Sequence, residues 1–196
     1  MIPNVRRRGF SLLELLIVIA ILMVVAAIAT PSIITTVDSY RLRTAASDMA
    51  GLMQRTRMQA VSLDHWYHVA NGTTAGRSFA YADLDGDNAL DQPAEFMIML
   101  PSGITVETTG APALTTMGLD FTANAGMAAF NARGLPCQVS GGACVSPAAA
   151  GGGEGWSGYV CYLRQDRSMD QPGWAAITVS AAGRVRFWTW TGSKWN

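Results

Sequence analysis

The order of apolar and polar positions divides the chain into three stretches. Residues Phe10–Ala29 carry a single charged side chain, Glu14, in twenty positions. An apolar helix of this length spans about 30 Å, which matches the hydrocarbon core of a bilayer. Residues 31–64 then place apolar side chains three and four positions apart, and residues 65–196 change to the shorter period of β-strands. The pattern predicts a membrane-spanning helix at 10–30, an amphipathic helix and a β-rich domain.

The amphipathic helix is predicted from one apolar stripe whose opposite side is polar and rich in arginine. Its members are Leu42, Ala45, Met49, Leu52, Thr56, Ala60 and Leu63. Both parts are expected to form one helix from Phe10 to about Ser62, with a bend at Pro31, where the ring removes a hydrogen bond. The stripe is expected to cover one face of a sheet.

Alternating apolar residues between turn signals predict about seven strands after the helix. They are expected at 66–69, 77–82, 95–100, 103–107, 158–164, 174–180 and 184–190, with a weaker signal at 118–122 and a turn at Asn71-Gly72. Short connections favour antiparallel pairing. The sequence thus predicts an α+β fold, in which a long N-terminal helix packs on an antiparallel sheet domain. Residues 139–155, rich in Gly, Ala and Ser, are expected to form an exposed loop.

The junction before the apolar run is unusual for a membrane anchor. Arg6, Arg7 and Arg8 precede Gly9 and favour the cytoplasmic side, so the C-terminal part is expected outside the cytoplasm. A secretory signal would instead have its cleavage site after the apolar run. Glu14 is also unusual, because an unpaired charge within a bilayer costs roughly 2.5–3.5 kcal/mol. A partner is therefore expected for this carboxylate.

The residues from Gly9 to Glu14, Gly-Phe-Ser-Leu-Leu-Glu, resemble the class III signal of type IV pilins and pseudopilins. The resemblance implies that prepilin peptidase removes a leader, residues 1–9, by cleaving between Gly9 and Phe10, and then methylates the amine of Phe10. It also implies that Glu14 assists assembly by meeting that amine in an adjoining subunit. The implied partners are other major and minor pilins or pseudopilins. The implied location is the inner membrane, followed by a pilus or pseudopilus in the periplasm or at the cell surface.

The three cysteines, Cys137, Cys144 and Cys161, belong to a domain expected in an oxidising compartment. Cys137 and Cys144 flank a glycine-rich turn, so this pair is favoured as the disulfide, although sequence alone leaves all three pairings open. No second cysteine pair or histidine has the spacing of a metal site.

An acidic stretch at 83–91 has the Asp-x-Asp-Gly-Asp start of some calcium loops. It lacks the frame of an EF-hand, and Asp and Gly are ordinary turn formers, so calcium binding is left open. The surrounding segment resembles a hairpin of the H-type pseudopilins and FimT/FimU minor pilins through Tyr81, Asp83, Gly86 and Glu95. A later segment, 130–136, resembles another landmark of that group, a strand that ends in Arg-Gly.

Chemical motifs for catalysis are missing from the sequence. His65 and His68 lie together without an evident third ligand, and no phosphate loop or nucleophile elbow occurs. We therefore expect a structural protein without an enzymatic activity, a metal site or a cofactor.

The C-terminal stretch differs in charge from the rest. The formal net charge is zero, and removal of the three leader arginines leaves eleven basic and fourteen acidic residues, a net charge of −3. From Gln171 onward, however, Arg184, Arg186 and Lys194 are accompanied by no acidic residue. In a strand, both arginines share a face with Trp188 and Trp190. Guanidinium groups suit phosphates and exposed indoles suit stacking on bases, so this region is a candidate DNA-binding site.

The alternative is an ordinary edge strand, with Val185 and Phe187 in the core and the arginines in solvent. The stretch Gly183–Arg186 resembles the Gly-Arg-x-Arg motif of FimT-like minor pilins, which in some bacteria bind DNA during natural transformation. H-type pseudopilins also end a strand in Gly-Arg. The favoured interpretation is a minor pilin of a type IV pilus with DNA as a candidate partner. The alternative is an H-type minor pseudopilin at the tip of a type II secretion pseudopilus, without DNA binding.

Overall fold

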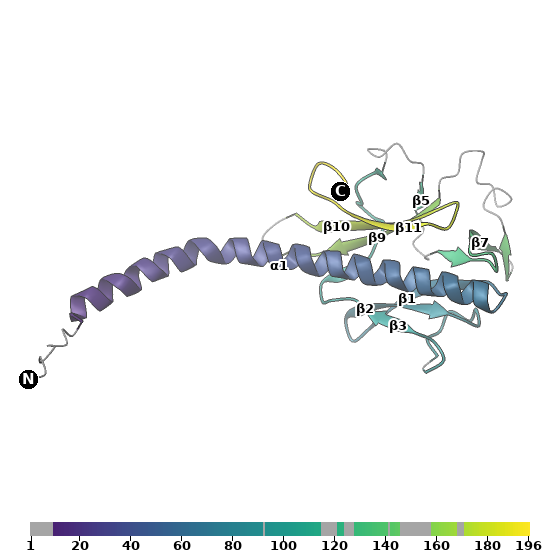
Figure 1. Ribbon diagram of the computed structural model, residues 1–196, viewed down its shortest axis with the longest axis horizontal. Coiled ribbons are helices and arrows are strands. Elements are labelled where there is room, and N and C mark those ends of the chain that lie inside the picture. Colours follow the sequence, from purple (N-terminus) through teal and green to yellow (C-terminus); the bar gives the residue numbers. More distant parts are fainter. Residues whose placement is uncertain are drawn as a thin grey trace, which may run out of the picture. The chain divides into compact units, whose positions relative to one another are not determined.

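The computed structural model describes residues 10–91, 93–114, 121–123, 128–140, 142–145, 158–167 and 171–196. The chain forms two compact units, Met1–Ser39 and Tyr40–Asn196. One helix, α1 (Leu12–Ser62), contributes to both units and is continuous through residue 31 (Figure 1). Its end at Ser62 is the end that the apolar stripe predicts.

Within the first unit, the described side chains of α1 are almost all exposed. Two hydroxyl groups in the C-terminal part of this unit donate hydrogen bonds to the backbone of the same helix. Thr30 Oγ1 donates to the Ala26 carbonyl and Ser39 Oγ donates to the Thr35 carbonyl, both at 2.8 Å. These bonds give both hydroxyl groups an acceptor within the helix itself. By length and composition α1 is able to cross a membrane.

In the second unit, α1 buries the predicted stripe. Leu42, Ala45, Met49, Leu52, Thr56 and Ala60 are all buried. Thr56 is tolerated there because its hydroxyl donates to the Leu52 carbonyl at 3.0 Å. The last predicted member, Leu63, lies beyond the helix and is exposed.

The β-strands that follow α1 form two sheets. The first has the order β3-β2-β1-β6-β7-β8 and the second has the order β11-β10-β9-β4, with β5 added to β9. The strands of the first sheet are β1 (Tyr67–Thr74), β2 (Arg77–Asp83), β3 (Met97–Met99), β6 (Ala129–Phe130), β7 (Pro136–Ser140) and β8 (Ala143–Val145). Those of the second sheet are β4 (Ile104–Val106), β5 (Phe121–Ala123), β9 (Gly158–Gln165), β10 (Gly173–Ser180) and β11 (Val185–Thr189).

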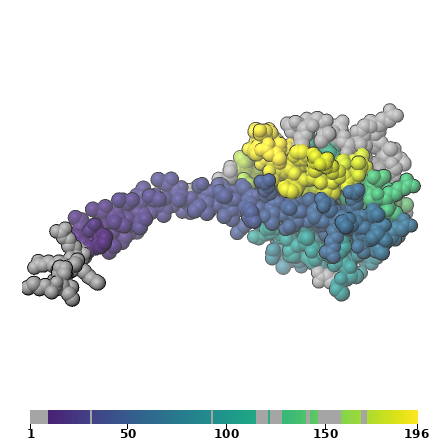
Figure 2. Space-filling view, in the orientation of Figure 1, coloured from purple at the N-terminus to yellow at the C-terminus, as the bar shows by residue number. Residues whose placement is uncertain are grey.

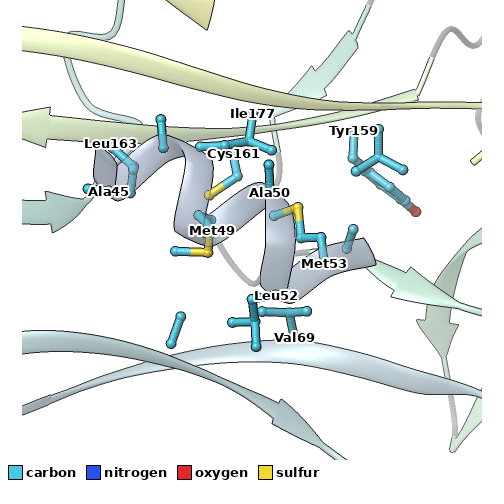
Figure 3. Close-up of a cluster of buried hydrophobic side chains, with 14 of the residues drawn as sticks. Ala45, Met49, Ala50, Leu52, Met53, Val69, Tyr159, Cys161, Leu163 and Ile177 are labelled. Carbon is cyan, nitrogen blue, oxygen red and sulfur yellow. The ribbon is translucent and has the colours of Figure 1, made fainter. Parts of the chain in front are cut away.

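Helix α1 packs between the two sheets, whereas the stripe was expected to cover one sheet face (Figure 3). Leu52 lies toward Val69 of β1, and Met49 and Met53 lie in the same cluster as Cys161 and Ile177 of the second sheet. The second contact is possible because buried alanines on α1 let both sheets approach closely. They are Ala45, Ala46, Ala50 and Ala60.

Two local predictions about the first sheet are wrong. The turn expected at Asn71-Gly72 lies inside β1, and the hairpin turns at Ala75 and Gly76, both of which have positive φ. Gly72 pairs with Phe79 of β2, and the Phe79 ring covers it, so that a Cβ there would lie 2.6 Å from the ring. The loop expected from residue 139 instead continues β7 and forms the β7–β8 hairpin up to Val145. Residues 141 and 146–157 lie outside the described residues.

The expectation of purely antiparallel pairing is also wrong at one strand. Strand β5 pairs parallel with β9, with Phe121 opposite Gly158. Strand β4 pairs antiparallel with the Leu163–Gln165 part of β9, so the Gly158–Val160 part accepts a different partner on the same edge. The weak strand signal at 118–122 overlaps β5, and residues 115–120 lie outside the described part.

The second sheet is apolar on both faces. Alternate residues of β9 and β10, such as Cys161 and Ile177, join α1 in the first core. The intervening residues form a second hydrophobic cluster on the opposite face. It comprises Leu114, Val160, Tyr162, Trp174, Ala176 and Trp195, with Phe121, Trp188 and Trp190 packed against it.

Candidate functional site

The assembly segment at the N-terminus is described from Phe10 onward. Phe10 is exposed, and Glu14 lies in the first turn of α1 with an exposed side chain. Gly9, the other half of the expected cleavage site, lies outside the described residues. Cleavage, methylation of Phe10 and the assembly role of Glu14 remain predictions.

The acidic stretch at 83–91 is organised around the buried carboxylate of Asp83. Asp83 Oδ1 accepts from the backbone N–H of Gly86 at 2.6 Å, and Oδ2 accepts from that of Asn88 at 2.8 Å. His68 Nε2 lies 3.3 Å from the same Oδ2 and 3.1 Å from Asn88 Oδ1. Two predicted landmarks, Asp83 and Gly86, thus have a structural function in closing the loop.

Glu95 closes the other side of this loop. Its Oε1 accepts from the Leu84 N–H at 2.7 Å and its Oε2 from the Asp91 N–H at 3.1 Å. Burial, together with the charges of Asp83 and Glu95, raises the pKa of Tyr81. The hairpin landmarks therefore form one network of carboxylates and backbone amides.

Asp83, Asp85 and Asp87 are close enough to share a cation, with one oxygen of each within 4.8 Å of the others. However, each of these carboxylates already accepts a backbone amide. Asp85 Oδ1 accepts from Asp87, and Asp87 Oδ1 accepts from Ala89. The loop geometry is explained without an ion, and calcium binding stays an open expectation.

The structure joins Cys137 and Cys144 in a disulfide, the pair that the sequence favours. Their Cα atoms lie 5.5 Å apart, on the hairpin of β7 and β8. Cys161 is free and buried in the first core, and burial raises the pKa of its thiol to about 12. Its contribution is packing.

Two glycine landmarks that are distant in the sequence meet beside Arg57. The Arg57 Nε–H donates to the Gly134 carbonyl at 2.8 Å. Gly183 lies against that same carbonyl, so a Cβ at Gly183 would collide with the Gly134 oxygen. Both glycines have positive φ, +71° and +76°. The junction fixes the point from which Arg184 and β11 begin.

Strand β11 separates its apolar residues between the two cores. Val185 and Phe187 pack against the first core, as the edge-strand interpretation expects. Arg186 shares the opposite face with Trp188, and its Cζ lies 6.0 Å from the indole centroid. Trp188 donates its Nε1–H to Thr178 Oγ1 at 3.0 Å and packs against the second core.

The expectation that Trp188 and Trp190 are exposed for base stacking is wrong. Both indoles are half-buried, and the Trp190 ring lies 5.3 Å from that of buried Trp195. The sequence contains a sign that these indoles are covered, because Tyr162 and Trp174 make the outer face of the second sheet apolar. Aromatic residues next to such an apolar face are expected to pack against it and shield it from water.

Two grooves lie between α1 and the C-terminal segment that begins at Ala182 and includes β11. One, of about 620 Å³, is lined by residues that include Arg43, Gln54 and Arg186. The other, of about 670 Å³, is lined by residues that include Arg57 and Arg184. Figure 2 shows the two elements side by side, with the C-terminal strand in yellow along the blue helix.

Within the part of the chain that the structure describes, the residues lining the two grooves include four arginines and no Asp or Glu side chain. The ion pairs found among described residues involve His68 and Arg164 and none of these four arginines. The grooves therefore present positive charge without an internal counter-ion. Lys194 is exposed in the turn at Thr191–Lys194 and does not line either groove.

These features define an α+β protein whose N-terminal helix is able to cross a membrane by length and composition and whose second unit presents two arginine-lined grooves. A family model, the prokaryotic N-terminal methylation motif, matches residues 4–30. The type II secretion system protein H of Xanthomonas campestris pv. campestris is 40% identical over 62 residues, which is 31% of this chain and 37% of that protein. The match thus spans little more than a third of the relative's length. No solved structure matches the chain. Through this N-terminal part the chain is similar to type IV pilins and pseudopilins, and both matches support a place in that family.

Proposed function

We propose that the chain is a minor subunit of a type IV filament, anchored in the inner membrane through residues 10–30 before assembly. The proposal rests on the match to the N-terminal methylation motif, which covers the junction at Gly9 and Phe10 and the apolar run after it. Prepilin peptidase cleaves the leader and methylates Phe10. The carboxylate of Glu14 then pairs with the terminal amine of an adjoining subunit, which offsets the cost of placing a charge among apolar helices.

The experiment that tests this assembly function separates processing from incorporation. Glu14→Ala is expected to leave leader cleavage intact and to abolish recovery of the subunit in sheared filaments. Asp38→Ala removes a carboxylate from the same helix outside the apolar run and serves as the matched control. Recovery of Glu14→Ala in filaments at the level of the control would contradict the proposal.

We further propose that the filament subunit binds DNA through Arg184 and Arg186, with Lys194 as an additional contact. The supporting observation is the pair of arginine-lined grooves beside β11, which contain no Asp or Glu side chain among the described residues. A phosphodiester backbone supplies the missing negative charge, and binding through a few arginines is salt-sensitive and independent of sequence.

DNA binding is tested with the full chain in nonionic detergent and a labelled 30-base-pair duplex. Arg184→Gln/Arg186→Gln is compared with Arg41→Gln/Arg133→Gln, which removes two exposed arginines that line neither groove. The first pair is expected to lose most of the affinity at 0.1 M salt, and the second to keep it. Lys194→Gln is expected to weaken binding less than either groove arginine. Absence of binding by the wild type at low salt would remove DNA from the function.

A second candidate is the H-type minor pseudopilin of a type II secretion system. The observation in its favour is the similarity to type II secretion system protein H from Xanthomonas campestris. Deletion of the gene distinguishes the candidates, since loss of protein secretion with normal DNA uptake favours the pseudopilin, and the reverse result favours the DNA-binding pilin.

A further inference from the structure

We infer that Arg43 and Arg57 of α1 contact phosphates of the same DNA duplex as Arg184 and Arg186, so that the binding site comprises the two grooves between helix and strand. This inference rests on the proposed DNA binding and extends it to residues outside the C-terminal motif. Arg43 lines one groove with Arg186, and Arg57 lines the other with Arg184.

The spacing of the two helix arginines suits the phosphates of a DNA duplex. Fourteen residues separate Arg43 from Arg57, and a rise of about 1.5 Å per residue places them roughly 21 Å apart along α1. Duplex DNA completes a turn in about 10 base pairs and its major groove is about 12 Å wide, so a straight span of this length reaches phosphates on the two sides of a groove. The four arginines can therefore contact phosphates of both strands on one face of the duplex.

The side chain of Arg57 is already oriented by a hydrogen bond before it contacts a phosphate. Its Nε–H is already bonded to the Gly134 carbonyl, which fixes the plane of the guanidinium group. A guanidinium has five N–H donors, so four remain for phosphate oxygens. A side chain oriented before binding loses less conformational entropy when the ligand arrives.

The ligand chemistry is phosphate rather than base. Trp188, the indole that lines a groove, is held by Thr178 and by the second core, and Phe187 is packed against the first core. Without a free ring for stacking, oligonucleotides of equal length and different base composition are expected to bind alike.

The test measures affinity for the 30-base-pair duplex over a salt series with the full chain. Each phosphate contact contributes about 0.9 to the slope of log K against log salt concentration. Arg43→Gln and Arg57→Gln are each expected to reduce the slope by about that amount and the affinity at 0.1 M salt by roughly five- to tenfold. Arg41→Gln, two residues from Arg43 on the same helix, is the matched control and is expected to leave the slope unchanged.

The variant Arg57→Lys distinguishes the contribution of Arg57 to phosphate binding from its contribution to the stability of the fold. This variant keeps the charge and loses the planar fork, so it is expected to retain most of the slope even if its melting temperature falls. The inference is overturned if the wild type binds and depends on Arg184 and Arg186, while Arg43→Gln and Arg57→Gln behave like Arg41→Gln. Failure of the wild type to bind at all would instead overturn the DNA-binding proposal itself.

Discussion

Arg57 of the helix and Gly134, in the turn between β6 and β7, are joined by a hydrogen bond of 2.8 Å from Nε to the carbonyl oxygen. Gly183, which precedes the basic strand, lies against the same oxygen. The two glycine landmarks are therefore connected in space through one side chain of α1. The motif Gly183–Arg186 has a structural component that is separate from any ligand.

Gly183→Ala is expected to destabilise the fold by about 2–4 kcal/mol, because the new Cβ meets the Gly134 oxygen and φ is +76°. Gly192→Ala is the control, since φ there is +93° with open space around the Cβ position. It isolates the backbone strain and is expected to cost about 1 kcal/mol. Urea unfolding measures both values, and equal losses would contradict the steric explanation.

Asp83→Ala is expected to cost about 2–4 kcal/mol, because it leaves buried backbone donors of the acidic loop without an acceptor. Asp87→Ala, an exposed carboxylate of the same loop, is expected to cost less than about 1 kcal/mol. A thermal melt of each variant provides the measurement. A similar fall in melting temperature for Asp83→Ala and Asp87→Ala would show that the burial of Asp83 does not matter for stability.

Calcium is expected to leave the melting temperature unchanged, because hydrogen bonds from backbone amides to Asp83, Asp85 and Asp87 already close the loop without an ion. The melt is recorded with excess calcium and with chelator. A rise with calcium that Asp85→Asn/Asp87→Asn removes would establish the cation site that the sequence leaves open.

Removal of the disulfide with Cys137→Ala/Cys144→Ala is expected to cost about 2–3 kcal/mol, the value for closure of a short loop in the unfolded chain. The free energy of unfolding in urea provides the measurement. Because Cys161 is untouched, a single free thiol should be titrated before and after the substitution. No change in stability would mean that the β7–β8 hairpin contributes little.

Cys161 links stability to alkaline pH. Burial raises the pKa of its thiol from 9.0 to about 12, so above pH 9 the unfolded chain releases a proton that the folded chain retains. This contribution is fully present below pH 9 and is lost as the pH rises toward 12. At pH 10 the free energy of unfolding is expected to be about 1 kcal/mol lower than at pH 8, relative to Cys161→Ala. Parallel behaviour of wild type and variant would contradict this linkage.

Local patterns in the sequence predicted α1, its stripe and most strands, because helical and strand periods are set by nearby residues. The placement of α1 between two sheets depended on small residues such as Ala46 and Ala50, which a hydrophobic stripe does not distinguish from larger ones. Parallel pairing of β5 with β9 depended on which part of an edge β4 leaves uncovered. Such strand pairings join residues that are distant in the sequence, so the pattern of neighbouring residues does not predict them.

The candidate site was predictable only in part. Arg184 and Arg186 stood out by charge, whereas Arg43 and Arg57 read as ordinary members of a solvated helix face. Their relevance depends on the position of β11 beside α1, which no local pattern contains. The burial of Trp188 and Trp190 had a usable signal in the apolar outer face of β9 and β10.

The enclosure of α1 between two sheets has a mechanical consequence. A force applied along the axis of α1 acts on the second unit as shear on two apolar interfaces at once, from Leu42 to Ala60. Many side-chain contacts must then slide together before any strand is peeled away. We therefore expect this unit to resist unfolding when a force pulls along the axis of α1.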